Sequence, residues 1–260
     1  VGIDPAHASF LHRFFEDEKP DEGYGLQFRD ATAEVPVTKL LREAVSPEIK
    51  IENTNSGFRI KTLRDLGNFG VHVRVTNLAF PNAIVIPMSN DMTISQWHVP
   101  INDRECYWYA IFTAFENKVD KIAMRNQRRE LYSLPDYRPI RNRSNDWGYN
   151  PKEQETLTYT GMGLDINVHD NWAVESPGSI FNRSQEHLGS TDKAIIAYRK
   201  LLIERINVLE RGEVTSTTSL EQDMTGPIAV DTIGTRNNLD KCWYDYDCAR
   251  RDRSPWASID

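Results

Sequence analysis

Residues 48–80 read EIKIENTNSGFRIKTLRDLGNFGVHVRVTNLAF, and this stretch decides the fold class. It contains three runs, residues 48–54, 57–65 and 70–80, that are rich in β-branched and aromatic residues. The turn signals NSG and GNFG separate these runs. Short runs of this kind joined by tight turns predict consecutive β-strands.

The pattern continues toward the carboxyl end. Three more runs follow, NAIVIPM (82–88), MTISQWHVPI (92–101) and ECYWYAIFTAF (105–115), with FPN, SND and NDR as the intervening turns. Five or six consecutive strands in one block imply an antiparallel sheet, because a parallel sheet would need helices between its strands.

A long helix is predicted over residues 190–212, STDKAIIAYRKLLIERINVLERG. Ser190 or Thr191 can cap its start and Gly212 can end it. Its apolar stripe, which should lie on the sheet, consists of Ile195, Tyr198, Leu202, Ile206 and Leu209. A sheet followed by one such helix predicts an α+β helix-grip (START-like) fold, with a substrate cavity between sheet and helix. The outline alone supports only the binding of a small apolar molecule.

The remaining segments give weaker signals. Residues 4–16 predict a short helix, with apolar residues at helical spacing, and the next thirty residues predict a loop. Residues 120–146 are rich in arginine and predict part helix and part surface loop. We expect a single domain over residues 1–260, with a core at about 1–212 and a carboxyl-terminal extension at 213–260 that has no clear assignment.

Composition limits the partners. With 38 acidic and 31 basic residues, the net charge is −7, which argues against a nucleic-acid or anionic-membrane surface. The longest apolar run, LAFPNAIVIPM, is interrupted by two prolines and is too short to cross a bilayer. No signal-peptide pattern is recognised at the amino end, and the three cysteines are few and odd in number. These features predict a cytoplasmic protein that binds small molecules or other proteins.

Two of the six histidines lie in GIDPAHASFLHR, residues 2–13. Asp4, His7 and His12 form the pattern D-x-x-H-x-x-x-x-H, and two imidazoles with one carboxylate are the ligands of mononuclear non-haem iron. In an ideal α-helix His7 and His12 would point about 140° apart. One metal could bind both only if the helix bends or contains a π-bulge. The alternative is two unrelated histidines and no metal.

These residues resemble the iron-binding segment of Rieske-type aromatic-ring-hydroxylating oxygenases, in particular the phthalate dioxygenase branch. A second segment, HDNWAVESPGSIFNRSQEHLGSTDKAIIAYRKLL (169–202), is similar to the carboxyl-terminal signature of that branch. NDWGYNPKEQETLTYTGMG (145–163) and HVPINDRECYWYAIF (98–112) also look like family segments. The resemblance therefore rests on separated motifs in the same order.

The resemblance implies roles for individual residues. His7 and His12 would be the imidazole ligands, and Asp170 the carboxylate that completes the triad. His169 stands where the family has Gln, which leaves open whether His169 or Asp170 faces the iron, and the triad pattern favours Asp170. The carboxylate of Asp4 would hydrogen-bond a ligand histidine and link the iron to a Rieske cluster on the neighbouring subunit.

The implied activity is hydroxylation of an aromatic substrate by O2 at Fe(II), as a dioxygenase, monooxygenase or O-demethylase. Electrons would come from NAD(P)H through a reductase and a Rieske 2Fe-2S cluster, in a homotrimer or hexamer. The substrate should carry a carboxylate, with Arg59 and Arg74 as its candidate partners.

The chain also lacks the cluster-binding part of the family pattern, and two rival functions stay open. It has none of the Cys-x-His and Cys-x-x-His pairs that hold a Rieske cluster, and it starts about where that domain ends in the family. We therefore expect a fragment without its amino-terminal Rieske domain. The rivals are a helix-grip binding module without redox chemistry and a zinc hydrolase that uses the same three ligands.

Overall fold

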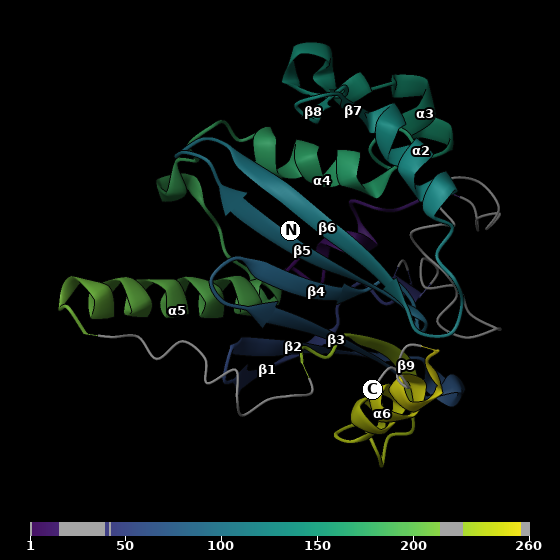
Figure 1. Ribbon diagram of the computed structural model, residues 1–260. Helices are drawn as coiled ribbons and strands as arrows, with labels where there is room; N and C mark the ends of the chain where they lie inside the picture. The colour runs from purple at the N-terminus through teal and green to yellow at the C-terminus, as the bar shows by residue number, and fades with distance from the viewer. Residues whose placement is uncertain (1, 16–39, 42, 214–225, 256–260) are drawn as a thin grey trace.

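A seven-stranded antiparallel sheet forms the centre of the computed structural model, which describes residues 2–15, 40–41, 43–213 and 226–255 (Figure 1). Six strands follow one another in sequence and in space: β1 (Glu48–Thr54), β2 (Gly57–Asp65), β3 (Val71–Ala79), β4 (Ala83–Pro87), β5 (Met92–Pro100) and β6 (Cys106–Ala114). The predicted block of consecutive antiparallel strands is confirmed, with nearly the predicted boundaries.

The seventh strand, β9 (Val230–Gly234), comes from the segment that we expected to be an extension. It pairs antiparallel with residues 71–75 of β3, whereas β4 pairs with residues 77–79 of the same strand. Helix α6 (Cys242–Arg253) follows, and its Trp243 packs into a buried cluster with valines of β3 and β9. Strand β9 therefore completes the sheet, and α6 packs against it.

The long helix is α5 (Lys193–Glu210), and only its first half lies on the sheet. Ala194 is wholly buried against β1, β2 and β3, and Ala197, Tyr198 and Leu201 pack around it. The predicted stripe is wrong in its second half, because Ile206 is 44% and Leu209 63% exposed. Figure 1 shows α5 running out past the edge of the strands.

The helix predicted over residues 4–16 is wrong as well. Within the described residues 4–15 the only helical turn is η1 (His7–Ser9), and residue 16 lies outside the description, as does most of the loop expected after it. The arginine-rich segment does contain the expected helix, α2 (Lys121–Leu131). The other elements are α3 (Pro151–Thr156), α4 (Ile166–Glu175), the hairpin β7 (Tyr132–Ser133) and β8 (Arg138–Pro139), and the short turns η2 (Gly67–Phe69), η3 (Arg143–Gly148), η4 (Arg183–Gln185) and η5 (Ser190–Asp192).

Different elements pack on the two faces of the sheet. Residues that pair directly across antiparallel strands share a face, and the register places Phe58, Leu78 and Ile84 together. This face carries α5, the amino-terminal segment and α4, whose Ile166 packs with Ile94. The opposite face carries α6. Among the described helices none is both long and apolar enough to cross a membrane.

Candidate metal centre

The two histidines of the amino-terminal motif meet because the chain leaves the helical path after η1. Beyond it the backbone extends: the Phe15 amide donates to the carbonyl of Leu157 (3.0 Å), and the Tyr159 amide donates to that of Arg13 (2.8 Å). This pairing ends the helix, so the angle expected for a continuous helix does not apply. The rings of His7 and His12 lie edge to face, with centroids 5.0 Å apart.

Helix α4 brings the carboxylate. Its start is capped by Asp165, whose side chain accepts the amide of Asn167 (2.9 Å), and Asp170 lies one turn further along. The distance from Asp170 Oδ1 is 3.2 Å to His12 Nε2 and 3.8 Å to His7 Nε2. One ligand atom of each of the three residues lies within 4.8 Å of the other two.

The protonation of this cluster suits a cation. The Nδ1 of His7 faces the backbone carbonyl of Asp4, which can only accept, so Nδ1 carries the proton and Nε2 keeps its lone pair. Burial, helped by the charge of His12, lowers the pKa of His7 to about 3. Burial works to raise the pKa of Asp170, but the neighbouring His12 and His7 hold it below its usual value. At neutral pH the cluster therefore offers a neutral imidazole and a carboxylate.

Asp4 acts through a different group from the one we expected. Its backbone carbonyl accepts the His7 proton, while its carboxylate accepts the amide of Ala6 at 2.8 Å. Burial raises the pKa of this carboxyl group. The expected bond between the Asp4 carboxylate and a ligand histidine is thus replaced by a backbone bond that serves the same tautomer.

Arg64 anchors this turn, and sequence reasoning missed it. Its side chain is 2% exposed and donates to the carbonyls of Pro5 (3.0 Å) and Ala44 (3.1 Å). Burial and the charge of Arg74 lower the pKa of Arg64 to about 10. A buried cation on β2 therefore fixes the backbone just before His7. The sequence shows only an arginine next to Leu63 in a predicted strand, which does not indicate that Arg64 is buried.

The two arginines suggested as substrate partners lie elsewhere. Arg59 pairs with Glu52 (2.9 Å) and stacks on the ring of Trp243, on the face of the sheet that carries α6. Arg74 pairs with the buried Asp231 of β9. Each guanidinium already has a carboxylate of its own chain, and the structure brings neither to the cluster of His7, His12 and Asp170.

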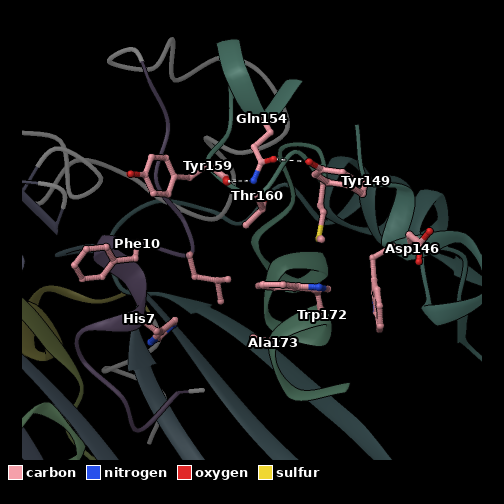
Figure 2. A pocket seen from close by; sticks show the side chains of 12 residues that line it. His7, Phe10, Asp146, Tyr149, Gln154, Tyr159, Thr160, Trp172 and Ala173 are labelled. Carbon is pink, nitrogen blue, oxygen red and sulfur yellow. Dashed lines mark hydrogen bonds between the residues drawn. The ribbon is translucent and has the colours of Figure 1, made fainter. Parts of the chain in front are cut away.

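A cavity of about 680 Å³ adjoins His7 (Figure 2). It lies between the turn around η1 and the segments 146–162 and 172–173, and not between the sheet and α5 as we expected. Its described lining is largely apolar and aromatic: His7, Phe10, Leu11, Asp146, Trp147, Tyr149, Gln154, Tyr159, Thr160, Met162, Trp172 and Ala173. Such a wall suits a flat apolar ring.

Trp147 is held in this wall by an unusual backbone. Asp146 and Trp147 have φ angles of 50° and 52°, a region that costs energy for residues other than glycine. The indole nitrogen of Trp147 donates to Glu175 at 3.0 Å, which ties the wall to the end of α4. The fold therefore holds this tryptophan in the cavity wall.

Two further histidines approach the cluster: His169, which the sequence left as an alternative to Asp170, and His98. His169 is wholly buried, and burial with the charge of His12 lowers its pKa to about 4. Its Nδ1 faces Nδ1 of His12 at 3.4 Å, so Asp170, and not His169, turns its ligand atom toward the two Nε2 atoms. Burial lowers the pKa of His98 on β5, and the charge of Asp170 opposes this shift.

Comparison with known proteins agrees with the motifs. The family described as "LigXa C-terminal domain like" matches residues 1–244. The curated "Phthalate 4,5-dioxygenase oxygenase subunit" of Pseudomonas putida is 29% identical over 223 residues, which cover 81% of this chain and 48% of that protein. The chain thus spans about half the length of the curated relative it matches. The resemblance seen in the sequence is confirmed at the level of the family.

Proposed function

The chain belongs to the LigXa C-terminal domain-like family, and from this membership and the metal-ligand cluster we propose that it is the catalytic domain of an aromatic-ring-hydroxylating oxygenase. His7, His12 and Asp170 would hold Fe(II). The observation that carries the proposal is the convergence of these three side chains from segments more than 150 residues apart. Two imidazoles and one carboxylate form the ligand set of non-haem iron oxygenases, which leaves further positions on the metal open.

The donor atoms support a cation at this point. Oδ1 of Asp170 is buried and has no hydrogen-bond partner among the described residues, although the Nε2 atoms of both histidines are close by. A buried carboxylate oxygen of this kind is costly unless a cation neutralises it. When bound, Fe(II) would supply the O2 chemistry that protein side chains lack.

The cavity beside His7 is the proposed substrate site. Trp172 and Trp147 would hold an aromatic ring and exclude water, while His7 forms the part of the wall nearest the ligand cluster. The expected carboxylate on the substrate has no arginine or lysine partner among the described lining residues. The aromatic class of the substrate therefore rests on the wall and on the phthalate named in the relative, and Arg59 and Arg74 are not part of this proposal.

Electron supply and assembly complete the proposal. NAD(P)H, a reductase and a Rieske 2Fe-2S cluster would deliver electrons, and Asp4, which contacts His7, would link that cluster to the iron as the family resemblance implies. The protein would be cytoplasmic. The homotrimer or hexamer is what the family resemblance implies, and a face that could contact another subunit is offered by the exposed apolar side chains of β5 and β6, namely Trp97, Tyr107, Tyr109 and Ile111. Whether the product is a cis-diol, a phenol or a demethylated ring depends on the substrate.

Iron content after anaerobic loading with Fe(II) tests the metal site. The wild-type chain should retain close to one iron per chain after desalting, and Asp170→Ala should retain almost none. Asp146→Asn is the matched control, because this exposed carboxylate lies in the cavity wall outside the triad. It should keep its iron.

Equal iron in wild type and Asp170→Ala would refute the proposed centre. Selective retention of Zn(II) over Fe(II), without O2 consumption when a Rieske donor, its reductase, NADH and an aromatic carboxylate are supplied, would favour a zinc hydrolase. The absence of any bound metal would favour a binding module without redox chemistry.

A further inference from the structure

We propose that His169 is a positioning residue that holds His12 in the tautomer able to bind the metal. This inference rests on the proposed metal centre and adds a role that the ligand motif does not contain. The three groups in line are the carbonyl of Gly163, the ring of His169 and the ring of His12.

The first link is fixed by the backbone. Gly163 has a φ of +82°, and a side chain at this position would collide with the guanidinium of Arg141. Its amide donates to Glu153 at 2.7 Å. The Gly163 carbonyl is therefore presented in a set direction, and Nε2 of His169 lies 2.8 Å from it.

The second link follows from counting protons. A carbonyl oxygen can only accept, so the proton of neutral His169 lies on Nε2, and its Nδ1 carries a lone pair. That lone pair faces Nδ1 of His12 at 3.4 Å, with the two rings 28° from parallel. Only a proton on Nδ1 of His12 makes this contact attractive.

The reverse arrangement fails at both ends. If His169 donated from Nδ1 to His12, its bare Nε2 would oppose the lone pairs of the Gly163 carbonyl. His12 would then carry its proton on Nε2, which is the atom 3.2 Å from Asp170 Oδ1 and the one that must bind the metal. The relay from Gly163 through His169 thus leaves Nε2 of His12 free for the cation.

His12 and His7 then obtain the same tautomer by different means. His7 donates its Nδ1 proton directly to a backbone carbonyl, that of Asp4. His12 reaches a backbone carbonyl only through His169, which is 0% exposed. Glutamine, the residue that the family resemblance expects here, also offers an acceptor and a donor, Oε1 and Nε2 on the same carbon, and could replace the imidazole.

The test compares metal affinity, measured by competition with a chromophoric chelator, in wild type, His169→Leu and His169→Gln. His169→Leu should weaken Fe(II) and Co(II) binding by about 10- to 100-fold, the usual cost of losing the partner of a ligand histidine. His169→Gln should restore most of it. The ligand-field absorption of bound Co(II) should change in His169→Leu and return toward wild type in His169→Gln.

His72→Leu is the matched control, because His72 is also 0% exposed and hydrogen-bonded, to Asp231, but lies outside the triad. It should lower the melting temperature without changing metal affinity. If His169→Leu does not fold, His169→Asn replaces it, since the shorter amide cannot reach both partners and should lose affinity.

Wild-type affinity and an unchanged Co(II) spectrum in His169→Leu, or in His169→Asn where it serves as the replacement, would overturn the inference while leaving the metal centre intact. An equal loss of affinity in His72→Leu would also overturn it, because general destabilisation would then explain the effect. Failure of the wild-type chain to bind Fe(II) or Co(II) would instead refute the proposed function itself.

Discussion

Replacement of Asp231 by Asn should destabilise the protein strongly and in a way that depends on pH. Asp231 lies on β9 directly opposite Arg74 of β3, and its carboxylate is 0% exposed. It accepts hydrogen bonds from His72 and Arg74, and the buried Arg64 contributes a further positive charge. This carboxylate therefore joins β9 to β3 at the centre of the sheet.

The magnitude follows from the pKa. Burial works to raise the pKa of Asp231, but the charges of Arg74 and His72 outweigh it and bring the value from 3.8 to about 2. At about 1.4 kcal/mol per pH unit, this corresponds to about 2.5 kcal/mol of folding free energy. Because the pKa is lower in the folded state, the stabilisation is complete above about pH 5 and is lost as the pH falls toward 2. At pH 7 Asp231→Asn also leaves buried cations unpaired, so the total loss should be about 3–5 kcal/mol.

Urea unfolding of the chelator-treated protein between pH 7 and pH 2 measures the effect. The difference between wild type and Asp231→Asn should be largest at pH 7 and shrink by about 2 kcal/mol at pH 2, where half of the folded-state carboxyl is protonated, while the other carboxylates cancel in the comparison. Glu52→Gln is the control: this partly exposed carboxylate on β1 pairs with Arg59 and Lys61 and should contribute at most about 1 kcal/mol. A difference below 1 kcal/mol at pH 7, or one that does not vary with pH, would refute the reasoning.

Three further predictions concern the core, the cavity and the metal. Phe58→Ala, at the centre of the α5 contact, should cost about 3–5 kcal/mol in urea unfolding, whereas Leu209→Ala on the exposed end of α5 should stay within about 0.5 kcal/mol; equal effects would contradict the observed packing. Trp172→Ala should lower the affinity for phthalate or benzoate at least several-fold without changing iron content, with the affinity measured by quenching of the remaining tryptophan fluorescence. Unchanged affinity would exclude the cavity as the substrate site. Chelation should lower the melting temperature of iron-loaded wild type but not of Asp170→Ala, because a metal present at 100 times its Kd stabilises by about 2.7 kcal/mol; an equal shift in both would place the metal elsewhere.

Local signals predicted the sheet because its first six strands are defined by their own residues. Alternation and turn residues such as Gly57 and Gly70 lie within the strands and hairpins that they specify. Strand β9 has no such signal: it is five residues long, contains an aspartate and pairs with β3 across more than 150 positions. A charged residue in so short a run is a poor predictor of a buried strand, and only its partners Arg74 and His72 explain it.

The face of α5 could not be chosen from periodicity because the helix carries apolar residues on more than one side. Ile195, Leu202 and Leu209 form one acceptable stripe, and Ala194 and Leu201 form another about 100° away. The structure buries the second stripe, in which the small Ala194 allows close approach to the sheet. Counting hydrophobic residues favours the bulkier stripe, whereas packing here depends on shape.

At the proposed metal centre, the cluster of His7, His12 and Asp170 could be predicted from the sequence, but its geometry could not. Phe10, Leu11 and Phe14 have helical spacing, and a helix would have kept His7 and His12 apart. The backbone pairing of residues 13–15 with 157–159 prevents that helix, and these partners are known only after the chain has folded. This long-range pairing begins directly after His12, which meets His7 and Asp170 in one cluster. Local preference and final structure therefore conflict at the segment that carries the chemistry, which is where such conflict is expected in natural proteins.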